Sequence, residues 1–325
     1  KAPKYSFVMR TDSAGTIIPD PDHYVSGDNL DSLYSNELGG YAFPKGVLII
    51  QETKAPEGYI ISDEKFVVDL TKDGGEVVTG GNEATEELKA LEKPVKGNVK
   101  ITKLDYDLKE NAPQGNATLA GATIAIINRT GGMVKGNDGI NYFPDETIAT
   151  LTTNENGEAE YDGLPYGQYE AVETSAPNGY LLKGNTSVIF NITTNGETVE
   201  LKGSGNTIED QVIRGGVKIQ KRDLELKETT PQGDGSFEKI RIDITNLSTH
   251  KVMVNGKVYQ PGEVCASLYT DANGYIESAN NLLPYGHYRA DETEVSEGYL
   301  KQGVLSQTFD ITSDGQMEDL TQTGR

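Results

Sequence analysis

Short runs in which apolar and polar residues alternate recur along most of the chain. The segments "VKITK" at 99–103 and "VKIQK" at 217–221 place every second residue on one face. This period of two is typical of β-strands with one buried face. The pairs Asn195-Gly196 and Asp314-Gly315 stand between such runs and predict hairpin turns. Many short strands with regular turn signals predict an all-β fold built from β-sandwiches.

The pattern repeats with a period of about 120 residues. The box "ETKAPEGY" begins at Glu52, "ETSAPNGY" at Glu173 and "ETEVSEGY" at Glu292, with separations of 173 − 52 = 121 and 292 − 173 = 119 residues. Repeats of this size predict tandem domains. We therefore expect three β-sandwich domains at residues 1–94, 95–214 and 215–325.

The three repeats are not equally complete. The first strand-like segment of the first repeat is "YSFVMRTDS", which matches the second strand of the other repeats. The first repeat therefore lacks the opening strand. Its last part, "EATEELKALEKPVKG" from Glu83, reads as a charged linker, helical or extended, that Pro94 closes. The matching segment "TIEDQVIRG" from Thr207 reads as a shorter connector.

Charged residues fall at positions that the alternation assigns to the buried face. Lys103 and Lys221 share the parity of the apolar residues before them, and Glu173 and Glu292 lie on strands that follow Pro-Tyr-Gly turns. A buried lysine costs several kcal/mol unless it is neutral or paired. Three hypotheses remain open: buried Lys–Glu ion pairs, surface residues at strand ends, or an intramolecular amide cross-link.

The cross-link hypothesis needs an acceptor on a strand near the lysine. A desolvated lysine loses its proton more readily, and a buried Glu can shuttle protons. Since the first and last strands of a sandwich commonly pair, we expect Asn206 as the acceptor for Lys103. Asn82 is the match in the first repeat. Asn206 follows the turn glycine Gly196 by 206 − 196 = 10 residues. The same count from Gly315, 325 − 315 = 10, places Arg325 at the acceptor position of the third repeat.

Composition and charge narrow the functional classes. The chain has 325 residues, 35% of them hydrophobic, no Trp and a net charge of −21. Such an acidic surface repels phosphates, so we expect neither nucleic acid nor anionic membranes as partners. The single cysteine, Cys265, cannot form an internal disulfide and is expected to be a small buried residue.

The sequence gives little sign of an enzyme. His23, His250 and His287 lie in unrelated places, and no phosphate-binding loop or nucleophile–base spacing appears. The loop Asp20–His23 has metal-ligand residue types, yet exposed loop acids are usually solvated. We expect no cofactor and no metal.

The chain resembles a known family through "VKIQKRD", "GATIAII" and the three Glu boxes. These are similar to the B-type repeats of Gram-positive collagen adhesins and to SpaA-like pilins; the box at Glu292 departs because it lacks Ala-Pro. The resemblance implies that the three sandwich domains are Ig-like and prealbumin-like. It also implies Lys–Asn isopeptide bonds that form once, with loss of ammonia, and no turnover. It implies reactive lysines, promoting acids and acceptors at these positions: Lys103, Lys221, Glu52, Glu173, Glu292, Asn206 and Asn82.

The resemblance also implies a place and a role. We expect an extracellular, cell-wall-anchored stalk or shaft segment of an adhesin or pilin-like protein. The partners implied are neighbouring pilin subunits, or host matrix protein or glycan if one repeat is a ligand-binding module, which is the alternative function. The turn "FPKG" at Lys45 is similar to the linkage site of pilins, although it aligns with the turns "LPYG" of the other repeats.

Overall fold

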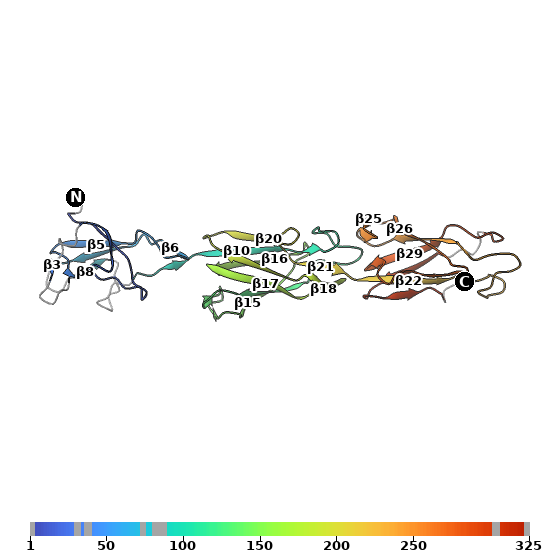
Figure 1. Cartoon of the computed structure of the whole chain (residues 1–325), viewed down its shortest axis with the longest axis horizontal. Coiled ribbons are helices and arrows are strands. Elements are labelled where there is room, and N and C mark those ends of the chain that lie inside the picture. The colour runs from blue at the N-terminus through green and yellow to red at the C-terminus, as the bar shows by residue number, and fades with distance from the viewer. Residues whose placement is uncertain are drawn as a thin grey trace. The chain divides into compact units, whose positions relative to one another are not determined.

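A computed structural model describes most of the chain. The described residues are 4–28, 34–35, 41–71, 76–79, 90–300 and 306–321. Throughout these ranges the regular elements are all β-strands, as the alternation predicts (Figure 1). None of the residues described belongs to a helix with the length and apolar character required to cross a bilayer.

Residues 1–94 and residues 95–325 form two compact bodies. The first body has a three-stranded sheet in the order β5-β7-β8 and the strand pairs β1-β2, β3-β4 and β6-β9. Its strands are β1 (Phe7–Met9), β2 (Tyr24–Gly27), β3 (Tyr34–Ser35), β4 (Tyr41–Ala42), β5 (Val47–Gln51), β6 (Tyr59–Ile60), β7 (Lys65–Asp69), β8 (Glu76–Thr79) and β9 (Lys93–Pro94).

The second repeat opens the second body and is a sandwich of antiparallel and parallel pairs. One layer has the order β15-β12-β17-β19, and the other is formed by β16-β10-β20 and β11-β21-β18. Strands β13 and β14 form a separate hairpin. The strands are β10 (Lys96–Thr102), β11 (Leu104–Asp105), β12 (Thr123–Asn128), β13 (Val134–Lys135), β14 (Asn141–Tyr142), β15 (Thr147–Thr152), β16 (Glu158–Pro165), β17 (Gly167–Ser175), β18 (Tyr180–Asn185), β19 (Ser187–Ile192), β20 (Thr198–Leu201) and β21 (Glu209–Val212).

The third repeat has the same plan. Its layers are β26-β23-β29-β30 and β27-β22-β28, with β31 also paired to β22, and β24-β25 is the separate hairpin. The strands are β22 (Arg214–Gln220), β23 (Arg241–Asn246), β24 (Val252–Val254), β25 (Lys257–Tyr259), β26 (Val264–Tyr269), β27 (Tyr275–Glu277), β28 (Leu283–Pro284), β29 (Gly286–Glu292), β30 (Ser306–Ile311) and β31 (Met317–Asp319).

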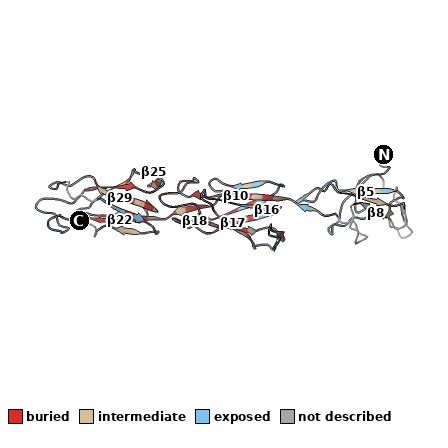
Figure 2. Ribbon diagram, turned by 180° about the vertical axis from the view of Figure 1, so that it is seen from behind, coloured by how far each residue is buried: buried red, intermediate tan, exposed pale blue. Residues whose placement is uncertain are grey.

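Each of these two sandwiches has its own apolar core. In the second repeat, Val99 and Ile101 of β10 meet Ile124 and Ile126 of β12. In the third, Val217 of β22 belongs to the equivalent cluster, and Cys265 is buried in it as expected. Buried positions alternate with partly exposed ones along β10 and β17, which confirms the alternation in the sequence (Figure 2).

Two of the expected hairpins do not form. Strand β19 pairs with β17 and β20 pairs in parallel with β10, so the turn at Asn195-Gly196 joins the two layers. The turn at Asp314-Gly315 likewise joins β30 to β31. Strand β30 pairs with β29, whereas β31 pairs with β22 of the other layer. The prediction of hairpins at these two turns was wrong, because the strand after each turn pairs with the opening strand of its repeat, in the other layer. In the first repeat β7 and β8 do pair with each other.

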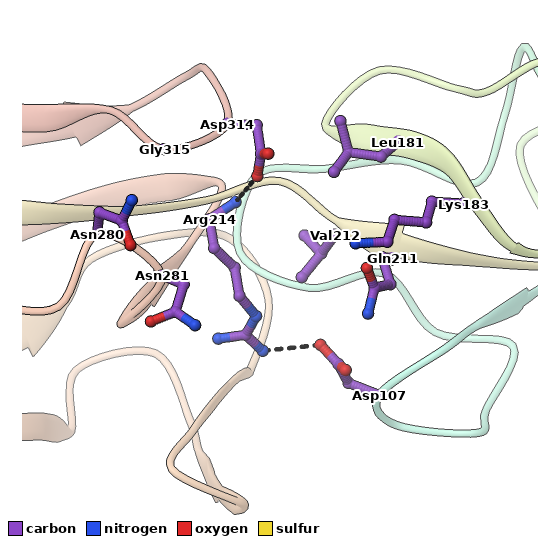
Figure 3. A pocket seen from close by; sticks show the side chains of 10 residues that line it. All are labelled: Asp107, Leu181, Lys183, Gln211, Val212, Arg214, Asn280, Asn281, Asp314 and Gly315. Carbon is purple, nitrogen blue, oxygen red and sulfur yellow. Dashed lines mark hydrogen bonds and ion pairs between the residues drawn. The ribbon is translucent and has the colours of Figure 1, made fainter.

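The second and third repeats contact each other directly. The amide of Gly115 donates to the carbonyl of Lys251 at 3.0 Å, and the amide of Asn116 donates to the carbonyl of Tyr285 at 3.1 Å. The guanidinium of Arg214 reaches back to Asp107 at 2.8 Å. A cleft of about 320 Å³ lies at this junction, and Figure 3 shows Arg214 between Asp107 and Asp314.

Candidate functional site: a buried lysine between two acids

Strand pairing in the second repeat brings three ionisable residues together. Lys103 lies at the junction of β10 and β11, Glu173 lies near the end of β17, and Asp210 lies on β21. β21 runs parallel to β11, with Asp210 opposite Asp105. The register is fixed because the amide of Leu104 donates to the carbonyl of Ile208 at 3.0 Å.

The lysine amine lies within bonding distance of both acids. Lys103 Nζ is 2.7 Å and 2.9 Å from the two oxygens of Glu173. It is 2.8 Å from Asp210 Oδ2. All three side chains are 0% exposed. The parity argument for Lys103 and Glu173 is therefore confirmed, and these residues are not frayed surface positions.

The environment changes the protonation of Glu173. Burial raises its pKa to about 8; the neighbouring Lys103 opposes this shift and Asp210 adds to it. Two acids and one amine make a cluster with one surplus negative charge when all three are ionised. A protonated Glu173 removes that surplus, so the low-dielectric interior favours the neutral acid.

Asp210 is the less satisfied of the two buried aspartates near the site. Neither of its oxygens receives a well-aligned hydrogen bond, although Oδ2 is close to the amine. Asp105 instead accepts bonds from the amide of Leu108, from Tyr180 Oη and from Gln114 Nε2, at 2.8, 2.7 and 3.1 Å. A buried acceptor without aligned donors is unusual and indicates a functional group. Asp210 is thus the carboxyl that is open to the lysine.

The expected acceptor, Asn206, is not at this site. It is exposed, in a turn where its amide donates to the carbonyl of Gly203 at 3.0 Å. The segment "TIEDQVIRG" is more than a connector, because it contains strand β21. Ile208, Asp210 and Val212 share one parity and are buried, but Thr207 and Glu209 are buried too, so the alternation in the sequence did not single out Asp210.

The third repeat has a similar pair. Lys221 Nζ lies 2.9 Å from Glu292 Oε2, and Glu292 is buried while the lysine side chain is 19% exposed. The two predicted residues are therefore brought together, in a less enclosed setting than in the second repeat. The position of Arg325 lies outside the described residues.

The first repeat shows only its acid. Glu52 is partly buried, and its Oε2 accepts a hydrogen bond from the amide of Ser62 at 2.7 Å. Asn82 lies outside the described residues. Lys45 is exposed in a bend before β5, as expected for a turn.

No set of three or more metal-ligand side chains with suitable placement occurs among the described residues. In the loop of residues 20–23, His23 Nδ1 lies 2.6 Å from Asp20 Oδ1. Hydrogen bonding to His23 lowers the pKa of this aspartate. The loop is thus accounted for by a local interaction.

Comparisons with known proteins agree with this architecture. The family model of the SpaA prealbumin-like fold domain matches residues 11–84, 97–207 and 218–324. The comparison with curated proteins found no match. The structure of the Bacillus anthracis TIE protein aligns over 97% of this chain, with 22% identity and a TM-score of 0.51. This chain covers 46% of that protein, so it spans about half of its length.

Two further solved structures are similar at lower TM-scores. The shaft pilin SpaA from Lactobacillus rhamnosus GG aligns over 69% of this chain and 96% of its own, with 18% identity and a TM-score of 0.28. The major pilin subunit of Bacillus cereus aligns over 70% and 98%, with 14% identity and a TM-score of 0.24. Because the family model matches three times along the sequence, the chain belongs to the family of SpaA prealbumin-like fold domains, of which it contains three in tandem.

Proposed function

We propose that the chain is a structural stalk or shaft segment of a Gram-positive surface pilin or adhesin, stabilised by an amide between Lys103 and Asp210. The observation that carries this proposal is the buried contact of Lys103 with Glu173 and Asp210. A chain of tandem sandwiches with an acidic, soluble surface suits a protein that spaces other domains.

The proposed reaction is a condensation that occurs once per molecule. The ammonium of Lys103 first gives a proton to Asp210, whose Oδ2 is 2.8 Å away. The resulting amine attacks the carbon of the Asp210 carboxylic acid, a C–N bond forms, and the C–OH bond breaks. Protonated Glu173 donates to the developing oxyanion and passes its proton to the leaving oxygen, while the amine proton returns to Glu173. One water molecule leaves, and Glu173 is restored. Because the acceptor is Asp, the leaving molecule is water, where an Asn acceptor would release ammonia.

Such a bond would close a long loop. It spans 210 − 103 = 107 residues and joins the end of the opening strand to β21. By analogy with a disulfide, a loop of this length restricts the unfolded chain by up to about 4–5 kcal/mol. An amide withstands reducing agents, so this stabilisation does not need the paired cysteines that the chain lacks.

The proposal for the third repeat is narrower. The structure describes Lys221 and Glu292 of the third repeat, with Lys221 Nζ 2.9 Å from Glu292 Oε2, and we assign an ion pair to them. An extracellular location, pilin subunits as partners and the absence of enzymatic turnover belong to this proposal. Binding of host matrix or glycan by the first repeat stays an alternative prediction.

Intact-mass spectrometry of the full chain tests the amide. The wild type should be lighter than its sequence by one water, in the presence or absence of reductant. Glu173→Gln should have the mass of its unmodified sequence because the proton shuttle is lost. Glu155→Gln, an exposed loop substitution with the same change of charge, is the control and should keep the loss of water. A wild-type mass equal to the plain sequence would contradict the proposal.

A further inference from the structure

The cleft between the second and third repeats is lined by side chains from both. Leu181 of β18 and Gln211 of β21 line it on one side, and Asn280 and Asn281, which follow β27, line it on the other. Figure 3 shows Arg214 between these two groups of side chains. The cavity has a volume of about 320 Å³, and small-molecule sites of about 300–1,000 Å³ often lie between domains. The cleft therefore has room for a small ligand.

A β-bulge shapes the wall that the second repeat contributes. In the pairing of β18 with β21 the register shifts between Leu181 and Gly184, so residues 182 and 183 are extra. Gly184 has φ +140°, and a Cβ there would lie 2.2 Å from the carbonyl oxygen of Glu209, so the bulge depends on glycine. Bulges redirect side chains and are common beside functional sites. This bulge places both Leu181 and Lys183 in the lining of the cleft.

The charged groups of the cleft are balanced. The guanidinium of Arg214 lies 2.8 Å from Asp107 and donates to the carbonyl of Met253 at 3.0 Å. Asp314 accepts a long hydrogen bond from the amide of Arg214, at 3.4 Å. Together with Lys183, the lining holds two cations and two anions and has no net charge. A neutral ligand therefore enters without net repulsion, whereas a phosphate or sulfate would face two carboxylates.

The side-chain amides of the cleft have hydrogen-bonding capacity to spare. Among the described residues, the side chains of Gln211, Asn280 and Asn281 have no hydrogen-bond partner. Each of these amides offers two N–H donors and one acceptor oxygen. A hydroxyl group also donates and accepts, so it can pair with either end of an amide. An apolar ligand would instead cover the amides without replacing their bonds to water.

We propose that this cleft binds a short neutral saccharide. Its hydroxyl groups bond to the amides of Gln211, Asn280 and Asn281. Leu181 and Val212 add apolar surface to the same lining, on which a sugar ring can pack the face that carries mainly C–H groups. Several hydroxyl groups on one small ring match several amides around one small cavity, and this match selects the ligand class.

The two walls of the cleft belong to different repeats, so a bound saccharide contacts both at once. Binding therefore stabilises the arrangement of the second and third repeats in which the cleft is formed. The site is separate from the buried cluster at Lys103, and its function does not depend on the amide.

Saturation-transfer difference NMR with the full chain tests the site. The probes are maltose, cellobiose, lactose and N,N′-diacetylchitobiose, with inorganic phosphate as an anionic comparison. At least one disaccharide should bind saturably, with a Kd in the millimolar range or below. Gln211→Ala and Asn281→Ala should each weaken binding about three- to tenfold, because hydrogen bonds of a neutral amide are lost.

The control is Asn206→Ala, which removes an exposed amide that does not line the cleft and should bind as the wild type does. Thermal unfolding curves verify that each variant is folded. Three results would overturn the proposal: no binding of the four disaccharides at millimolar concentrations, equal binding by the folded Gln211→Ala and Asn281→Ala chains, or displacement of the bound disaccharide by phosphate. The intact mass of the same sample reports on the Lys103–Asp210 amide separately.

Discussion

Asp210 is the residue on which the proposed amide of the second repeat depends. It is buried beside the amine, and its oxygens have no aligned donors. Asp105, in the next strand, is also buried but is held by four donor groups, the amides of Asp107 and Leu108, Tyr180 Oη and Gln114 Nε2. Burial raises the pKa of Asp105 while those hydrogen bonds lower it, so its carboxyl serves the local turn.

Substitution of Asp210 distinguishes the acceptor. Asp210→Asn should still form the amide, now with release of ammonia, and its product should have the same mass as the cross-linked wild type. Asp210→Ala should have the mass of its plain sequence. Asn206→Ala, in the exposed turn, should retain the loss of water. If instead Asn206→Ala abolished the mass loss and Asp210→Ala kept it, Asn206 would be the acceptor.

At the scale of elements, the loop after β11 of the second repeat forms hydrogen bonds with the third repeat. Gln114 Nε2 donates to buried Asp105 at 3.1 Å, and Gln114 Oε1 accepts from the amide of Met253 at 2.7 Å. Gly115 has φ +58°, and a Cβ there would lie 1.9 Å from the carbonyl oxygen of Tyr285. The junction therefore depends on close backbone approach at a glycine.

The substitution Gly115→Ala should separate the two repeats. Its matched control is Gly233→Ala at the equivalent loop of the third repeat, where φ is +57° and nothing lies within 4 Å. Both variants carry the same backbone strain of about 1 kcal/mol, and Gly115→Ala alone meets Tyr285. Small-angle scattering should show a wider spread of interdomain distances for Gly115→Ala than for Gly233→Ala. Identical scattering would show that the contact with Tyr285 does not hold the junction.

At the scale of the whole molecule, the proposed amide decides how the chain responds to force. Pulling on the termini extends the segments outside the loop, while the 106 residues between Lys103 and Asp210 remain bypassed. At about 3.3–3.6 Å per residue, the bypassed segment corresponds to roughly 350–380 Å of missing extension.

Single-molecule stretching should measure this difference directly. The wild type should unfold to a contour length shorter than that of Asp210→Ala by roughly 350–380 Å. The difference should persist in reductant because an amide is not reduced by thiols. Equal contour lengths for the two proteins would contradict the cross-link.

The sequence by itself determined the class of fold, the number of repeats and two of the three residues at the site. Alternation with period two identifies the buried faces, and the same parity places Lys103 and Glu173 inward. These are local properties, because a strand's side chains point to opposite faces whatever it pairs with. Ile208, Asp210 and Val212 share one parity in the segment that we interpreted as a connector, but Glu209 is buried as well, so parity does not identify Asp210.

Only the tertiary structure decided which strands are neighbours. β20 and β31 pair with the opening strands of their repeats and not with the strands that precede them. β21 runs parallel to β11, and this pairing places Asp210 beside the amine of Lys103, 107 positions earlier in the chain. Such pairings depend on which edges remain free after the layers assemble, and the local pattern does not contain that information.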